Sequence, residues 1–379
     1  MDVDNKYTYI GQFNGNLKEG KGILINNNNI IVGEYKNDKL NGIGYNYDKN
    51  LKKKNIYNYI DDERKGDGTI FYENGRYEGS LKDDIRNGKG IYYYNDGDKY
   101  EGEWKEGKRE GKGIFYYNSG NIYDGDWKEG KRNGKGIMNY KNGNKYDGEW
   151  VNNDRIGKGI MYYENGNKYE GDWNNDVREG KGILTFPDEE KYEGHWKEDK
   201  KNGKGKYYFK NGNKYDGDWV NNDKVGKGIM YYNDGDKYDG DWINNKINGK
   251  GIYFYNNGNR YEGDWKEGKR NGKGIMNYKN GNKYDGDWVN NDRIGKGIMY
   301  YKNGNKYEGD WTNDVREGKG ILIVKDGGKY EGDWKNDKKN GKGIYYFKNG
   351  NKYDGDWVNN DRIGKGIMYY KNGNKYEGD

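Results

Sequence analysis

The sequence lacks cysteine altogether and has only one histidine and one proline among its 379 residues. Without cysteine there can be no disulfide framework, no thiolate zinc site and no cysteine nucleophile. The single histidine, His195, leaves one candidate for a histidine-based triad and none for a metal site that needs several histidines. These absences remove the disulfide-rich, zinc-binding and thiol-dependent protein classes.

Long apolar runs are also missing. No stretch approaches the roughly 20 apolar residues that a membrane-spanning helix requires. The first ten residues, MDVDNKYTYI, have neither the basic nor the apolar segment of a signal peptide. We therefore expect a cytoplasmic protein, with peripheral association with a membrane or the cytoskeleton as an open alternative.

Aliphatic side chains are scarce, because hydrophobic residues make up 30% of the chain and 43 tyrosines supply many of them. A chain with so little aliphatic surface ordinarily stays disordered. Disordered chains are also poor in aromatic residues, whereas here aromatics reach 16%, with 12 tryptophans and 66 glycines. The 69 basic and 63 acidic residues are interleaved and leave a net charge of +6, so the charge pattern gives little support for a nucleic-acid partner.

A short repeat of constant length dominates the sequence. The triplet Tyr-(Asp/Glu)-Gly begins at Tyr77 and Tyr100 and recurs at this same interval up to Tyr376, and every tryptophan from Trp104 to Trp357 lies four residues after such a tyrosine. A Gly-x-Gly pair follows each time. We predict about sixteen copies, with about three degenerate capping copies in residues 1–76 and regular copies in 77–379, the last of them incomplete. Residues 128–241 and 266–379 also align with each other, offset by six copies, which indicates an internal duplication.

Each copy is predicted to form a β-hairpin. In residues 344–357 an aromatic, β-prone segment precedes Asn349-Gly350, a strong hairpin signal, and an alternating segment follows it. A two-residue turn would place Tyr346 opposite Tyr353, and a bulged three-residue turn would shift this pairing by one residue. With the two-residue turn, one face carries Ile344, Tyr346, Tyr353, Gly355 and Trp357, and the other carries Tyr345, Phe347, Lys352, Asp354 and Asp356.

The aromatic residues and glycines of each copy are predicted to form the hydrophobic core together. A ring that lies flat on a sheet needs a neighbour without a side chain, and buried rings of about 150–250 Å² each can replace missing aliphatic residues. The Gly-x-Gly pair provides either the same vacancy on the partner strand or a positive φ at the loop exit. The predicted core residues in two representative copies are Tyr100, Gly102, Trp104, Gly111 and Gly113, and Tyr353, Gly355, Trp357, Gly364 and Gly366.

These hairpins should pair edge to edge. The predicted fold is an all-β, elongated and twisted antiparallel ribbon, or solenoid, of hairpin repeats. At two strands per copy and about 4.8 Å per strand, sixteen copies would span on the order of 150 Å. The open strand edges invite pairing with another chain, so we expect a homodimer to be accessible.

Residues 100–113, YEGEWKEGKREGKG, closely resemble the MORN repeat (membrane occupation and recognition nexus), and the resemblance extends over nearly the whole chain. It implies one hairpin per repeat and a role among junctional, cytoskeletal and ciliary scaffolds or as a targeting module of larger enzymes. Some family members associate with phosphoinositide-rich membranes, and some form extended homodimers. Since no kinase or methyltransferase sequence is present, the resemblance implies a non-catalytic scaffold. We expect its protein partners to lie along an aromatic groove or along the edges of the ribbon.

A basic stripe supports an alternative, a peripheral membrane adaptor that binds acidic phospholipids. The stripe is expected in a longer loop after each tryptophan, where acidic neighbours such as Glu106 and Asp154 weaken it. Because the chain stops at Asp379, one residue before the next expected tryptophan, a third alternative is the targeting module of a larger enzyme such as a lipid kinase. The residues of the stripe are Lys108, Arg109, Lys131, Arg132, Arg155, Arg178, Lys269, Arg270, Arg293, Arg316 and Arg362.

Other polar residues are interpreted as structural. His195 replaces the usual Asp or Glu between a glycine and a tryptophan, on the polar face. Asp354 and Asp356 are two residues apart, but the same pair recurs in nearly every copy, and catalysis does not need a dozen identical sites. We therefore predict no catalytic residue, no metal site and no cofactor.

Overall fold

The computed structural model describes residues 7–378, which form 33 strands and no helix. No segment in this range could therefore cross a membrane as a helix. The chain divides between Pro187 and Asp188 into two compact units. The all-β prediction is confirmed, whereas the predicted boundary at residue 76 stays a prediction.

The first unit contains sixteen strands, which pair antiparallel with their neighbours in chain order. They are β1 (Thr8–Asn14), β2 (Leu17–Ile25), β3 (Asn29–Lys36), β4 (Lys39–Asp48), β5 (Lys53–Ile60), β6 (Glu63–Tyr72), β7 (Gly75–Lys82), β8 (Ile85–Tyr94), β9 (Lys99–Lys105), β10 (Lys108–Tyr116), β11 (Ile122–Lys128), β12 (Lys131–Asn139), β13 (Lys145–Val151), β14 (Asp154–Tyr162), β15 (Lys168–Asn174) and β16 (Val177–Thr185).

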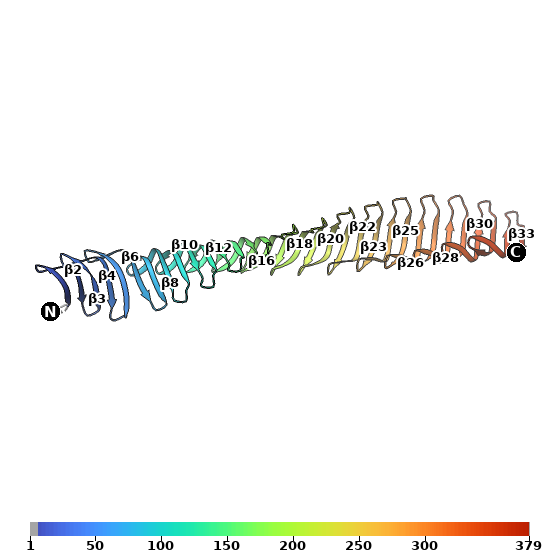
Figure 1. Cartoon of the computed structure of the whole chain (residues 1–379). Coiled ribbons are helices and arrows are strands. Elements are labelled where there is room, and N and C mark those ends of the chain that lie inside the picture. The colour runs from blue at the N-terminus through green and yellow to red at the C-terminus, as the bar shows by residue number, and fades with distance from the viewer. Residues whose placement is uncertain (1–6, 379) are drawn as a thin grey trace. The chain divides into compact units, whose positions relative to one another are not determined.

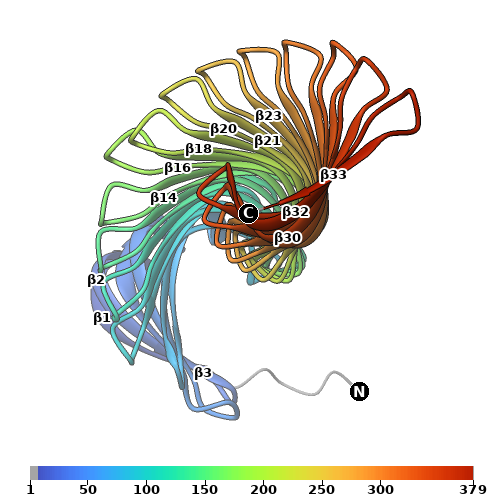
Figure 2. The same cartoon turned by 90° about the vertical axis from the view of Figure 1, so that its right-hand side faces the viewer.

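The second unit continues the same pattern. Its hairpins follow one another as a ladder in Figure 1 and fan out in sequence order in Figure 2, as expected for strands with a right-handed twist. Its strands are β17 (Lys191–Lys197), β18 (Lys200–Tyr208), β19 (Lys214–Val220), β20 (Asp223–Tyr231), β21 (Lys237–Ile243), β22 (Lys246–Phe254), β23 (Arg260–Lys266), β24 (Lys269–Asn277), β25 (Lys283–Val289), β26 (Asp292–Tyr300), β27 (Lys306–Thr312), β28 (Val315–Ile323), β29 (Lys329–Lys335), β30 (Lys338–Tyr346), β31 (Lys352–Val358), β32 (Asp361–Tyr369) and β33 (Lys375–Gly378).

Two kinds of turn alternate along each unit. β9 and β10 are joined by only two residues, Glu106 and Gly107, whose φ angles of 49° and 80° give a tight turn that matches the strand twist. β10 and β11 are joined by a five-residue tip, in which the Gly120 amide donates to the Tyr117 carbonyl over 2.8 Å. The prediction of a longer loop after each tryptophan is therefore wrong, because the longer connection lies at the Asn-Gly end of the hairpin.

The strand register differs by one residue from the two-residue-turn prediction. In the second unit Tyr345, not Tyr346, pairs with Tyr353. The tip turns at Phe347 and places Gly350 at a φ of 88°, so the bulged alternative is the one the chain adopts. As a result Ile344 and Tyr346 point to the face opposite Tyr353, together with the acidic residues.

The core of each unit is a stack of rings on one face of the sheet, here called the aromatic face. Tyr100 makes edge-to-face contacts with Trp104 of its own repeat and Trp127 of the next, with ring centroids 5.1 and 5.2 Å apart. Trp127 Nε1 donates to the Gly113 carbonyl over 2.9 Å, so its buried polar atom is satisfied. The rings thus build a core from neighbouring repeats and need almost no aliphatic residues.

The glycines of each repeat make this core possible. A Cβ at Gly102 would lie 2.5 Å from the Gly113 Cα, and one at Gly113 would lie 2.3 Å from the Tyr100 hydroxyl oxygen. Gly111 has a φ of 63° where β10 bulges away from β9. The same arrangement recurs in the second unit at Tyr353, Gly355, Trp357, Gly364 and Gly366.

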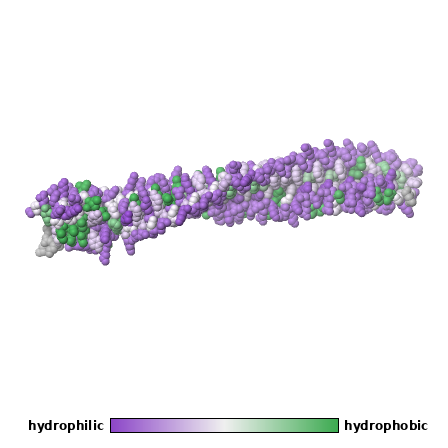
Figure 3. Space-filling model, in the orientation of Figure 1, coloured by the Kyte–Doolittle hydropathy of each residue, from purple (hydrophilic) through white to green (hydrophobic). Residues whose placement is uncertain are grey.

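The surface is mostly hydrophilic in Figure 3, apart from hydrophobic surface that gathers over the first strands of the first unit. In these strands Ile10, Phe13 and Ile43 are all more than half exposed. The rest of the surface is hydrophilic because the aromatic rings are buried in the stack.

Candidate functional site

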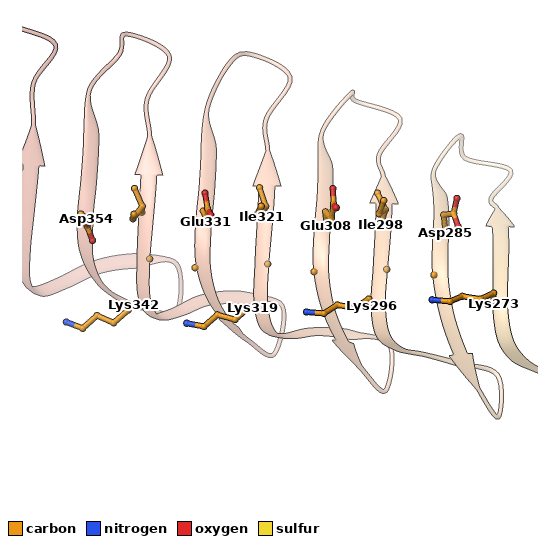
Figure 4. Close-up of a pocket in the computed structure, with 17 residues that line it drawn as sticks. Lys273, Asp285, Lys296, Ile298, Glu308, Lys319, Ile321, Glu331, Lys342 and Asp354 are labelled. Atoms are coloured by element: carbon orange, nitrogen blue, oxygen red, sulfur yellow. The ribbon is translucent and has the colours of Figure 1, made fainter.

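A groove crosses the strands of the second unit on the face opposite the rings, here called the charged face. It extends over β24–β31 and has a volume of about 890 Å³ (Figure 4). The lining residues are Lys273, Asp285, Gly286, Lys296, Gly297, Ile298, Glu308, Gly309, Lys319, Gly320, Ile321, Glu331, Gly332, Lys342, Gly343, Ile344 and Asp354. The same few residue types therefore meet the groove in every repeat.

One wall of the groove is a row of lysines, which line up in Figure 4. Each forms an ion pair with an aspartate of the following strand: Lys319 Nζ lies 2.5 Å from Asp333 Oδ1, and Lys296 Nζ lies 2.5 Å from Asp310 Oδ1. Burial of Asp310 opposes its ionisation, but the hydrogen bonds from Lys296 and from the amide of Lys319 keep its pKa below the usual value. These charges are therefore held in place and neutralised in pairs.

The other wall alternates isoleucine and acidic side chains. Ile321 pairs with Glu308 on one side and with Glu331 on the other, so apolar and acidic positions follow one another across the strands. The isoleucines are half-buried. This wall offers an apolar contact in each repeat.

Glycine main chain forms the floor between the walls. Gly309 pairs with Gly320, and the glycines of adjacent hairpins continue the row. A Cβ at Gly320 would lie 2.4 Å from the Tyr307 hydroxyl oxygen on the aromatic face, so the core requires glycine here. Residue 320 points to the aromatic face, so only its main chain lies between Lys319 and Ile321 on the charged face.

The groove is electrically balanced. Its four lysines pair with aspartates of the following strand, and each of its four acidic residues lies near a lysine two positions earlier in the same strand, as Glu308 lies 2.7 Å from Lys306. The four lysines and four acidic residues of the lining give a formal charge of zero. A balanced lining does not concentrate a polyanion or a polycation. The groove therefore suits a neutral or mixed-charge ligand.

A comparison with protein-family models identifies these repeats. The model described as "MORN repeat" matches fifteen segments, which together cover most of the chain. The chain belongs to the MORN-repeat family. The matched segments are residues 9–29, 32–45, 77–99, 100–122, 123–145, 146–168, 169–190, 192–214, 215–237, 238–260, 261–283, 284–306, 307–329, 330–352 and 353–375.

Among solved structures, the TCP domain of Drosophila melanogaster SAS-4 in complex with a proline-rich motif of Ana2 is 21% identical, with a TM-score of 0.28 over 41% of this chain and 85% of that chain. The TCP10 domain of Danio rerio CPAP is 13% identical, with a TM-score of 0.24 over 58% of this chain and 93% of that chain. No curated protein matches the chain.

The arginines of the predicted basic stripe lie near the start of a strand in their MORN repeats and fold back over the ring stack. The Arg109 guanidinium lies 4.3 Å from the Trp127 ring centroid and donates to the Gly130 carbonyl over 2.6 Å. Arg132, Arg155, Arg270, Arg293 and Arg316 make the same contact with the tryptophan of the next repeat. Arg178 lies over Tyr169 and Arg362 over Tyr353.

The lysines of the stripe behave differently from the arginines. Lys108, Lys131 and Lys269 are exposed beside the two-residue turns, and Lys108 pairs with Glu129. The predicted stripe is thus divided between arginines that pack on the core and lysines that face solvent.

The remaining predicted polar residues lie on the charged face. His195 Nδ1 is 3.1 Å from the Lys204 carbonyl oxygen. Asp356 pairs with Lys342 over 2.6 Å, and Asp354 lies 3.8 Å from Lys352. Within residues 7–378 no three His, Asp or Glu side chains come together in an arrangement that could hold a metal ion.

The groove does not lie where the sequence interpretation placed it. An aromatic groove was expected, but the rings of the MORN repeats are buried: Tyr307 is 0% and Trp311 3% exposed. The signal for the charged-face groove was the recurring Lys-Gly-Ile triplet, as at 319–321. Alternation along a strand places its lysine and isoleucine together on the face away from the tyrosine.

Proposed function

We propose that this MORN-repeat protein is a non-catalytic cytoplasmic scaffold that binds an extended segment of a partner protein in the charged-face groove. The observation that carries the proposal is the periodic lining of the groove, in which each repeat presents one lysine, one isoleucine and one acidic residue over glycine main chain. A periodic site suits a polymeric ligand, because each repeat of the scaffold can contact an equivalent part of it.

The spacing of the repeats indicates the form of the segment. Two strands at about 4.8 Å each give roughly 9.6 Å per repeat. A polyproline II chain advances about 3.1 Å per residue and therefore about 9.3 Å per three-residue turn. A segment with an apolar side chain at every third residue would place one of them beside each of Ile298, Ile321 and Ile344.

This proposal is tested with two synthetic peptides and the full chain. A labelled peptide of Leu-Pro-Pro repeats matches the period of the groove, whereas Leu-Pro-Pro-Pro repeats do not. Fluorescence anisotropy should show at least about tenfold tighter binding of the first peptide. Equal binding of the two peptides, or no binding of either, would contradict the proposed function.

A groove variant provides the second part of the test. Lysine replaces isoleucine naturally at Lys206, which occupies the equivalent position of β18, so Ile298→Lys, Ile321→Lys and Ile344→Lys should be tolerated by the fold. The triple variant should lose binding of the matched peptide. A control with Val289→Lys and Val358→Lys, both about 40% exposed at turns outside the groove, should keep it.

A peripheral membrane adaptor for acidic phospholipids is the second candidate function, and the exposed lysines Lys108, Lys131 and Lys269 are the observation that favours it. Each exposed base near an anionic leaflet contributes about 1 kcal/mol. Flotation of the protein with vesicles that contain phosphoinositides, and with neutral vesicles as a control, tests this candidate. No binding at physiological salt would eliminate it.

A further inference from the structure

The charged face changes its character over the first strands of the first unit. In a regular copy acidic residues and isoleucines alternate across this face, and Ile114 pairs with Glu101 on one side and with Asp124 on the other. Over β1–β5 the acidic positions are apolar instead, so one unbroken apolar row crosses five strands. Its members, each paired with the next, are Ile10, Ile23, Val32, Tyr45 and Ile56.

A lysine position of this face is apolar as well. Lys112 of a regular copy forms an ion pair with Asp126 of the next strand, whereas at the same place in β4 and β5 Ile43 pairs with Asn58. Ile43 is 63% and Tyr45 56% exposed, and hydrophobic surface gathers over these first strands in Figure 3. We call the apolar row together with Ile43 the N-terminal apolar face. A contiguous apolar surface of this kind marks a contact with another molecule.

The N-terminal apolar face is large enough for a specific interface. Its strands are about eight residues long, as in β3 and β5. Five strands at about 4.8 Å and eight residues at about 3.3 Å give a face of roughly 24 by 26 Å. Two such faces in contact would bury about 1,200 Å² in total, which reaches the range of specific protein interfaces.

The charges around this face indicate which molecule covers it. β5 runs from a basic end, where residues 52–54 are three exposed lysines, to an acidic end, where residues 61–63 are an exposed Asp-Asp-Glu segment. When a second copy is turned by 180° about an axis that crosses the strands, the basic end of each β5 lies over the acidic end of the other. The apolar rows then face each other, so the surface is complementary to itself.

We propose that the N-terminal apolar face binds the same face of a second copy of this chain, in a two-fold dimer whose strands run antiparallel across the interface. Two sheets that pack face to face keep their strands nearly aligned, which this arrangement satisfies. An anionic membrane would attract the basic end of β5 but repel its acidic end. The dimer uses neither the groove nor the open strand edges, and it does not depend on the proposed function.

Sedimentation equilibrium of the full chain tests the dimer. Between about 1 and about 100 μM it should show a monomer–dimer equilibrium. The variant with Ile10→Glu, Val32→Glu and Ile43→Lys carries the residues of the regular copies at these positions, so the fold should tolerate it. It should raise the dissociation constant of the dimer at least tenfold, whereas Val289→Lys with Val358→Lys, at exposed valines of the second unit, should leave it unchanged.

Three outcomes would overturn the proposal. The first is a natural chain that stays monomeric at about 100 μM. The second is a dimer that the triple variant does not weaken, which would assign self-association to the strand edges. The third is a monomeric chain that floats with vesicles containing acidic phospholipids and loses this binding in the triple variant, which would assign the face to a membrane.

Charge reversal tests the antiparallel arrangement and does not depend on the folding of the triple variant. Lys53→Glu with Lys54→Glu in one chain, and Glu63→Lys in another, each bring like charges together in a dimer of identical copies. Each variant alone should therefore dimerise several-fold more weakly than the natural chain. An equimolar mixture of the two variants places opposite charges together and should restore the dimer. A mixture that dimerises no better than either variant alone would contradict the proposed interface.

Discussion

Tyr100 lies over Gly113 so closely that a Cβ at residue 113 would be 2.3 Å from the tyrosine hydroxyl oxygen. Tyr100 is 0% exposed and held between two tryptophans, so its ring has no room to move aside. Gly113→Ala should therefore destabilise the surrounding repeats by about 2 kcal/mol or more. Hydrogen exchange of the β9–β11 amides would measure the loss.

A second glycine provides the control for this prediction. Gly130 has a φ of 81°, but a Cβ there would have no neighbour within 4 Å. Gly130→Ala should cost only the backbone strain of about 1 kcal/mol. If the two substitutions had equal effects, close ring packing would not be the reason for glycine at Gly113.

The indole nitrogen of Trp127 should contribute measurably to stability. Its hydrogen bond to the Gly113 carbonyl is 2.9 Å long and buried. Trp127→Phe keeps a ring but leaves this acceptor unpaired, so a loss of about 1–3 kcal/mol is expected in urea unfolding of the full chain. His195→Asp, which restores the common residue of the charged face, should be close to neutral, and a similar loss for both variants would argue against a specific role of this bond.

Arginine and lysine of the basic stripe should differ in their effects on stability. The Arg316 side chain is 18% exposed, lies 4.3 Å from the Trp334 ring centroid and pairs with Asp337. Arg316→Ala should lower the stability of the second unit by about 1–2 kcal/mol. Lys269→Ala, at an exposed position, should change stability little. Thermal unfolding checks both variants, and a neutral effect of Arg316→Ala would contradict the structural role of the arginines.

Lys201 should make stability depend on pH above neutrality. It takes the arginine position over Trp219, and burial, reinforced by the charge of Lys224, lowers its pKa from 10.5 to about 8. Between about pH 8 and 10 the unfolded chain holds a proton at this lysine that the folded chain has released, so the contribution of Lys201 to stability should rise with pH. Burial raises the pKa of core tyrosines such as Tyr215 and Tyr238, so their ionisation in the unfolded chain acts in the opposite direction as the pH approaches 10. Below pH 8 the charged side chain destabilises the fold.

The variant Lys201→Arg tests this linkage, because arginine stays protonated throughout the window. Urea unfolding followed by tryptophan fluorescence at pH 8, 9 and 10 should show that the free energy of unfolding of the variant falls, relative to that of the natural chain, as the pH rises. Burial also lowers the pKa of Lys224 and of Lys339, but these lysines and the tyrosines are present in both chains, so their effects should largely cancel in the comparison. A difference between the two chains that stays constant from pH 8 to pH 10 would show that Lys201 does not release its proton.

The sequence was sufficient to predict the fold class, because a short, constant period with alternating rings and an Asn-Gly signal is compatible with few structures other than consecutive hairpins. It could not decide the register. Asn349-Gly350 suits both a two-residue turn and a longer tip, and the choice depends on main-chain hydrogen bonds such as that from the Phe347 amide to the Asn351 carbonyl. A shift of one residue exchanges the faces of Tyr345 and Tyr346.

The candidate site was less predictable for a related reason. The stripe of arginines was assigned to a loop because Lys108 and Arg109 follow the tryptophan in a polar segment. Two residues with positive φ, Glu106 and Gly107, complete the turn instead, and Arg109 then points back to the next Trp127. To predict the groove, one must know which residues lie on the same face of the sheet, and this depends on the strand register.

Each tyrosine of the core is shared between two copies, as Tyr307 contacts Trp311 in its own repeat and Trp334 in the next. Inserting or deleting whole copies would therefore leave every junction chemically the same, whereas any other change of length would separate a ring from its glycine. The duplicated segments, residues 128–241 and 266–379, follow this rule because a whole number of copies separates them. Such a protein can grow or shrink in fixed increments, and a partner would gain or lose binding positions in the same steps.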